Sequence, residues 1–163
     1  MKTLFTSLIL VFLIHTLLVS QEVNHEVNKK EELIRTFYRD IFGDIKSPEE
    51  IVREYVVYSD SNYQDAIKSV NYFRMGSSNN ESFVIAFKKN LINNRIGLIG
   101  HNEFKEEDKA KFLKLDQKRL QDIYKLSIGD YPPIYVLLLG QKIESFFGFQ
   151  KAGDNEYLFI IYH

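Results

Sequence analysis

The pattern of apolar and polar residues divides the chain into a helical first part and an extended last part. Between residues 22 and 42, apolar side chains recur at intervals of three and four, which predicts an amphipathic helix that Gly43 ends as a left-handed cap. The same spacing from Ile51 to Val56 and from Tyr63 to Phe73 predicts two more helices, the later of them closed by Gly76.

The start of the second helix has the strongest local signal in the chain. It is the segment Ser47-Pro48-Glu49-Glu50. The Ser47 side chain is placed to accept from the backbone amide of Glu50, while the Glu50 carboxylate reaches back to the amide of Ser47. Pro48 suits the first turn, where its missing N–H is not needed. We therefore expect a capping box here.

Residues 81–93 form the next predicted helix. Ser78 and Glu81 repeat the capping-box spacing ahead of an apolar pattern of helical period. A strand is the alternative, because Ser82–Phe87 is a short apolar run that periodicity alone does not assign. After the Asn93-Asn94 break, Ile96–Ile99 is expected to be a short strand or a packed loop.

Residues 105–126 are strongly charged and again show helical spacing. Glu107 lies four residues before Lys111 and Asp108 three before it, which favours ion pairs on a helix. Asp116 is a candidate cap for a second helix, so one bent helix and two consecutive helices both fit. Mixed charges at this spacing are typical of a solvated face, and we interpret them in that way.

The last third changes to extended structure. After Pro132 and Pro133 come three apolar runs, Ile134–Leu139, Ile143–Gln150 and Tyr157–Tyr162, which predict a meander of antiparallel strands joined by glycine-containing turns. In the middle run, alternate residues should point to opposite faces of the sheet. Because helices come first and strands last, the predicted class is α+β, with N-terminal helices packed on a C-terminal antiparallel meander of three or more strands.

The amino-terminal segment resembles a cleavable signal peptide. Lys2 precedes an apolar run from Leu4 to Val19 that is shorter than a bilayer span, and a small residue, Ser20, precedes polar Gln21. We expect residues 1–20 to be removed and residues 21–163 to form a single domain, secreted or periplasmic, with no membrane attachment after cleavage. An uncleaved membrane anchor is the alternative.

Composition excludes several classes of function. The chain has 21 basic and 22 acidic side chains, a net charge of −1, so it lacks the basic excess that binding to nucleic acid requires. It contains no cysteine, which excludes disulfides, thiol catalysis and thiolate metal sites. Its 10 Tyr and 13 Phe supply the material for a core.

No catalytic motif stands out, and we expect no cofactor and no metal. The sequence lacks a nucleophile elbow, a phosphate-binding loop, a zinc-protease helix and a dinucleotide fingerprint. His101 is the one histidine away from the ends of the expected mature chain. An acid-base enzyme using His101 with Asp130 or Glu103 is one hypothesis. The alternatives are an exposed loop histidine and a turn-forming Asp130.

Three segments carry a resemblance to a known group. Leu33–Tyr38, Ser47–Tyr55 and the strand Tyr135–Leu139 with its closing hairpin make the chain similar to secreted NTF2-like, cystatin-like proteins. The resemblance implies a curved antiparallel sheet that meets a helix layer around a pocket, in proteins that are often small-ligand binders and sometimes isomerases or hydratases. The extra helical pattern between Asn62 and Leu126 departs from that order, and no catalytic residue carries over.

Five aromatic residues near the carboxyl terminus could line a pocket for an apolar or sugar ligand, although such a stripe more often belongs to the core. They are Tyr135, Phe147, Phe149, Tyr157 and Phe159. The principal hypothesis is an exported, non-catalytic domain that binds a small apolar ligand or a partner protein. The rivals are the acid-base enzyme described above and a protein of the inhibitor or immunity type.

Overall fold

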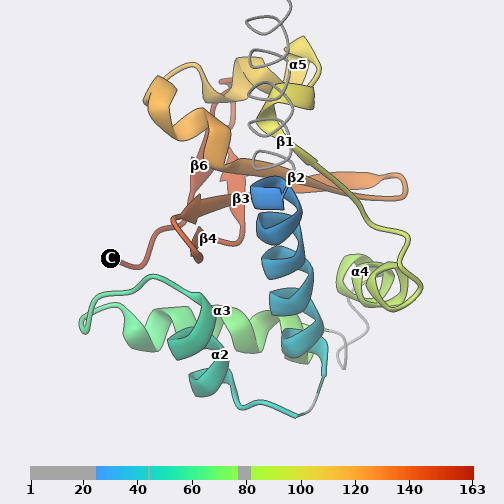
Figure 1. Ribbon diagram of the computed structural model, residues 1–163, viewed down its shortest axis with the longest axis vertical. Helices are drawn as coiled ribbons and strands as arrows, with labels where there is room; N and C mark the ends of the chain where they lie inside the picture. Colours follow the sequence, from blue (N-terminus) through green and yellow to red (C-terminus); the bar gives the residue numbers. More distant parts are fainter. Residues whose placement is uncertain (1–24, 44, 77–81) are drawn as a thin grey trace, which may run out of the picture. The chain divides into compact units, whose positions relative to one another are not determined.

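The computed structural model describes residues 25–43, 45–76 and 82–163 (Figure 1). The chain divides into two compact units, residues 1–32 and 33–163. The larger unit is α+β, with helices first and a four-stranded antiparallel sheet after them, as predicted. The expected signal peptide and the Ser78–Glu81 capping box lie outside the described residues.

The helices follow the predicted pattern closely. They cover residues 25–42, α2 (Pro48–Tyr55), α3 (Tyr63–Gly76) and α4 (Ser82–Ile92). The last of these settles the choice between helix and strand in favour of helix. Among the described residues, none of the helices combines the length and the apolar character needed to cross a membrane.

The two predicted helix caps have different outcomes. At α2 the capping box is complete, since Ser47 Oγ accepts from the Glu50 amide at 3.2 Å and Glu50 Oε2 accepts from the Ser47 amide at 2.7 Å. The prediction of a left-handed cap at Gly43 was wrong. Its amide donates to the Arg39 carbonyl oxygen at 2.8 Å, so the helical hydrogen-bond pattern runs on to Gly43, which is not among the glycines of positive φ.

The prediction of helix over residues 105–126 was largely wrong. Only α5 (Glu106–Lys109) is α-helical there, followed by the 3₁₀ helices η2 (Ala110–Phe112) and η3 (Gln117–Asp122) and then by strand β2 (Ile123–Ile128). The strand was missed because the helical spacing of the charged stretch was extended to Leu126, although Tyr124–Ile128 alternates between apolar and polar residues as a half-buried strand does. Asp116 does act as a cap, but for η3, where its side chain accepts from the Lys118 amide at 3.0 Å.

Antiparallel strands build the sheet in the order β1-β2-β3-β4. The bounds are β1 (Gly97–Gly100), β2, β3 (Tyr131–Leu139) and β4 (Lys142–Ser145), while β5 (Gly148–Gln150) and β6 (Tyr157–Phe159) pair as a separate two-stranded sheet. The expected middle strand is therefore broken, because Phe146 and Phe147 lie between β4 and β5. All four residues from Ile143 to Phe146 are buried, so the two faces of this run do not differ in exposure to solvent.

Alternate residues of the sheet feed two separate hydrophobic clusters. The larger, which we call the helix-side core, joins residues from all the helices up to α4 to one face of the sheet. The smaller, the turn-side core, lies on the opposite face with α5 and the 3₁₀ helices; in Figure 1, α5 and the pair α2 and α3 are on opposite sides of the sheet. Strand residues of the helix-side core are Leu98, Tyr124, Leu126, Ile128, Ile134, Val136, Leu138 and Ile143, and those of the turn-side core are Ile123, Tyr135 and Leu137.

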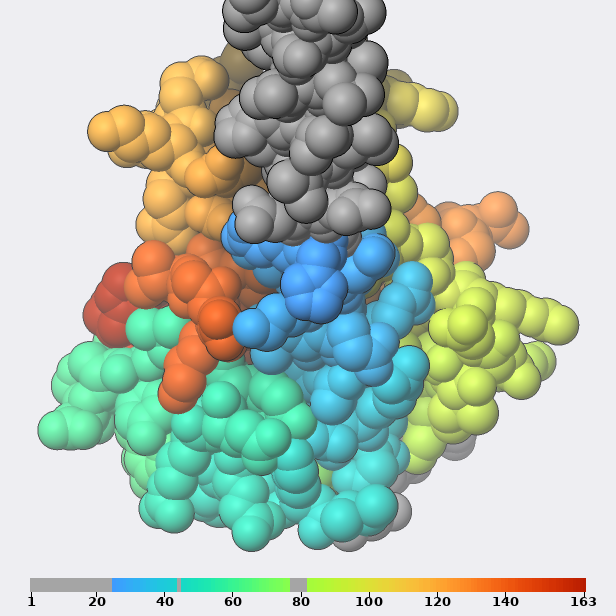
Figure 2. All heavy atoms as spheres, viewed as in Figure 1, coloured from blue at the N-terminus to red at the C-terminus, as the bar shows by residue number. Residues whose placement is uncertain are grey.

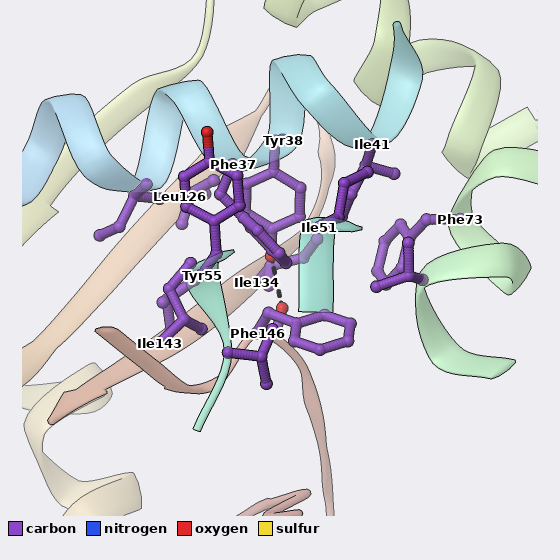
Figure 3. Packing of buried hydrophobic residues seen from close by; sticks show 14 of the residues in the cluster. Phe37, Tyr38, Ile41, Ile51, Tyr55, Phe73, Leu126, Ile134, Ile143 and Phe146 are labelled. Atoms are coloured by element: carbon purple, nitrogen blue, oxygen red, sulfur yellow. Dashed lines mark hydrogen bonds between the residues drawn. The ribbon is translucent and has the colours of Figure 1, made fainter. Parts of the chain in front are cut away.

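Aromatic rings contact one another within the helix-side core, among aliphatic side chains (Figure 3). Phe37 contacts Tyr55 and Phe146 with ring centroids 5.8 and 5.2 Å apart, and the Tyr38 hydroxyl donates to the carbonyl oxygen of Phe146. Burying one such side chain is worth about 1.5–3 kcal/mol relative to exposure. This core attaches the helical half of the unit to the sheet.

Candidate functional site

A cavity of about 460 Å³ lies where the beginning of β3 meets β5, close to both cores. Its walls come from α3, the start of α4, β3, β5 and β6, and one lysine from the 3₁₀ region completes it. The lining residues are Tyr72, Phe73, Phe83, Lys111, Tyr131, Pro132, Pro133, Ile134, Tyr135, Phe147, Gly148, Phe149, Gln150 and Tyr157.

Packed rings give the cavity its form. Phe83 and Tyr131 meet edge to face with centroids 5.8 Å apart, and Phe73 meets Phe147 in the same way at 5.7 Å. Such aromatic pairs contribute about 0.5–1.5 kcal/mol beyond the area that they bury, so the walls resist collapse. The cavity is a feature of the fold that neighbouring contacts maintain.

Exposed rings surround the opening. Tyr72 is 53% exposed and Phe149 54%, and Tyr131 is also exposed. All three line the cavity, so solvent-accessible apolar surface continues from its rim into its interior. Concave, mostly aromatic surface with few polar groups is the usual character of a small-molecule site.

Gly148 sets the spacing between two walls. It pairs with Phe159 across the β5–β6 sheet. A Cβ atom at this position would overlap the carbonyl oxygen of Leu158 and lie 2.8 Å from Cε1 of Tyr157. The close approach of the two strands therefore requires glycine, and with it the position of the Tyr157 ring in the cavity wall.

A buried ion cluster lies behind one wall. Asp108 is only 3% exposed and accepts from Lys111 Nζ at 2.8 Å, and it also accepts short hydrogen bonds from Lys125 Nζ and the Tyr135 hydroxyl. Burial alone would raise the pKa of Asp108, but these three donors together hold it well below the usual range. Asp108 is therefore a carboxylate at neutral pH.

The phenols in the cavity wall are protonated at neutral pH. Burial, followed by the Asp108 carboxylate, raises the pKa of Tyr135 far above its ordinary value of 10. Burial raises the pKa of Tyr157 to about 12. Both hydroxyl groups therefore act as hydrogen-bond donors and neither acts as a base.

Of the predicted candidate residues, His101 and Asp130 are not brought together, whereas Glu103 lies two residues from His101 in the 3₁₀ helix His101–Glu103. Gly100 pairs with Tyr124 at one end of β2, whereas Asp130 follows Ile128 at the other end, and each strand residue advances about 3.3 Å. Glu103 is exposed.

The His101 ring packs against Phe104 and Phe112, with centroids 5.1 and 6.3 Å away. Burial and then the charge of Lys109 lower the pKa of His101, which favours the neutral ring. His101 does not line the cavity.

Members of the aromatic set near the carboxyl terminus line the cavity and also pack in or against the cores. Tyr135, Phe147, Phe149 and Tyr157 line the cavity, whereas Phe159 packs in the turn-side core. The charge pattern predicted a solvated helix face for Asp108 and Lys111, and the burial of their ion pair was not predicted. The only local signal was their spacing of three residues, because the other partners, Lys125 and Tyr135, come from β2 and β3.

A second buried carboxylate anchors the end of the chain. Glu144 is 2% exposed and pairs with Arg119 and with His163, whose Nε2 lies 2.7 Å from Glu144 Oε1.

No group of three or more metal-ligating side chains occurs among the described residues.

Comparisons with known proteins add no relative to this picture. No protein-family model matches the chain, no curated protein matches it, and no solved structure matches it. The resemblance to NTF2-like proteins thus stays a prediction.

Proposed function

We propose that the protein is a non-catalytic binding domain that takes a small apolar ligand into the aromatic cavity. The observation that carries the proposal is the continuity of exposed rings at the rim with a ring-lined interior of about 460 Å³. Apolar surface gains about 25 cal/mol for each Å² removed from water, so a ligand that covers these rings is stabilised.

The chemistry of the lining supports binding rather than catalysis. Apart from its tyrosines, the only ionisable side chain among the described residues that line the cavity is Lys111, which is already hydrogen-bonded to Asp108 and to the Tyr135 hydroxyl. A general acid–base reaction needs a group that titrates near the working pH, and burial raises the pKa values of Tyr135 and Tyr157 well away from it.

Titration with the neutral fluorophore N-phenyl-1-naphthylamine tests the proposal. We expect saturable binding with one site per chain, and a loss of affinity of about tenfold in Phe149→Ser, because that ring lies at the opening. Leu113→Ser is the matched control, since Leu113 is 76% exposed and does not line the cavity. Ile92 on α4, which Figure 2 shows in yellow-green on the outer flank, is unsuitable because it lines a separate pocket of about 400 Å³. Equal loss in both variants, or no saturable binding, contradicts the proposal.

Export remains part of the same proposal. A domain that binds apolar molecules outside the cytoplasm is consistent with the apolar amino-terminal segment. Mass spectrometry of native protein should show a chain that begins at Gln21. A chain that begins at Met1, recovered from the cytosol, would contradict export while leaving the binding proposal in place.

A further inference from the structure

The polar end of the cavity wall carries more positive than negative charge. Asp108 is one carboxylate shared by two ammonium groups, those of Lys111 and Lys125. All three side chains are largely shielded from water, so their charges are screened less than surface charges are. The cluster keeps one unit of positive charge that no acidic group within it balances.

Lys111 presents this charge to the cavity. Its ammonium group has three N–H donors, and two of them are used, by Asp108 Oδ1 at 2.8 Å and by the Tyr135 hydroxyl oxygen at 2.8 Å. Among the described residues, no further acceptor contacts Lys111, and its side chain lines the cavity. Lys125 does not line it.

No acidic side chain among the described residues lines the cavity beside Lys111. Glu107 is the nearby carboxylate whose field reaches Tyr135, but its side chain is exposed and is therefore screened by solvent. Asp154 and Glu156 of the β5–β6 turn share the single ammonium group of Lys114 and leave one negative charge there, outside the cavity lining. Gln150, the other polar side chain of the lining besides the tyrosines, is neutral.

We infer that the ligand is an amphipathic organic anion, with an apolar body against the rings and a carboxylate or similar head group on Lys111 Nζ. The inference rests on the proposed function and names its ligand class. A charge-assisted hydrogen bond to a partly buried ammonium is worth about 1.5–3 kcal/mol, so the head group adds specificity to apolar burial.

The second lysine makes Lys111 dispensable for folding. In Lys111→Met, Asp108 keeps Lys125 and the Tyr135 hydroxyl as donors, so no buried carboxylate is left unpaired. Methionine also keeps the length and the apolar stem of the side chain. The variant therefore removes the charge from the cavity while the walls stay in place.

Two probes that differ by a single sulfonate group test the inference. They are 1-anilinonaphthalene-8-sulfonate and the neutral N-phenyl-1-naphthylamine, each titrated against folded wild-type protein, Lys111→Met and Lys114→Met. We expect Lys111→Met to weaken binding of the anionic probe about tenfold and to change binding of the neutral probe less than about twofold. Lys114→Met, which removes an exposed lysine outside the cavity lining, should leave both affinities unchanged.

The outcomes separate the two proposals. If the neutral probe fails to bind wild-type protein, the proposed function itself fails. If it binds but Lys111→Met lowers both affinities equally, or leaves the anionic probe unaffected, only the anion inference is overturned. An equal effect of Lys114→Met on the anionic probe would trace the preference to overall charge and would also overturn it.

Discussion

The two faces of the sheet are covered in different ways, and the difference separates stability from function. On one face, helices bring apolar side chains into a large and continuous cluster, the helix-side core. On the other, short 3₁₀ helices and one turn of α-helix cover a smaller cluster, the turn-side core, beside which the ion cluster of Asp108 is buried. Helices present a regular apolar stripe, whereas short turns cannot, so the second face retains the buried polar contacts of the ion cluster.

The difference between the two cores explains where a cavity forms in this fold. The helix-side core is sealed by side chains that come from distant parts of the chain and pack ring against ring. The cavity instead lies at the border, where β3 contributes Ile134 to one core and Tyr135 to the other. Its lining therefore includes Phe73 and Ile134 of the larger core together with exposed rings such as Phe149.

The largest expected effect is on the helix-side core. Phe37 is fully buried, and Phe37→Ala should lower the free energy of unfolding by about 3–5 kcal/mol, because it removes a ring and leaves a void. Urea denaturation followed by circular dichroism measures the change. Affinity for the neutral naphthylamine probe, measured on the folded variant, should stay within about twofold of wild type, because Phe37 does not line the cavity. A marked loss of affinity would mean that the two regions are coupled.

The next effect concerns the ion cluster on the turn side. Asp108→Asn leaves two lysines without their carboxylate and should cost about 3 kcal/mol of stability at neutral pH. Because the folded-state pKa of Asp108 lies below its unfolded value, its contribution is fully present above about pH 4 and is lost as pH falls further. The stability gap between wild type and variant should therefore narrow in acid. A gap that stays constant down to pH 2 would show that the Asp108 charge contributes nothing.

The smallest of these effects is at the border itself. Gly148→Ala should destabilise the protein by about 1–3 kcal/mol, because the added Cβ overlaps the Leu158 carbonyl and forces β5 and β6 apart. The Tyr157 ring moves with them, so probe affinity should fall together with stability. Gly153→Ala is a control in the adjacent turn, with open space around the new Cβ but strain from a φ of +78°. It should lower stability without changing probe affinity.

Local sequence determined much of the helical half. The Ser47 capping box needs only residues three apart, and the same short range defines α4 through its apolar spacing. The order of helices before strands also follows from local patterns, which is why the α+β class was predicted correctly. The backbone hydrogen bonds of these helices join residues three or four apart in the chain.

Only the tertiary structure decided the strand β2, the burial of Asp108 and the cavity. Asp108 belongs to a charged stretch, and its burial depends on Lys125 and Tyr135, which lie 17 and 27 residues further along. Strand β2 pairs with β1 on one side and β3 on the other, and the short alternation from Tyr124 to Ile128 does not by itself identify these partners. Charge burial and concavity arise from contacts between distant segments, and a one-dimensional pattern does not record which segments meet.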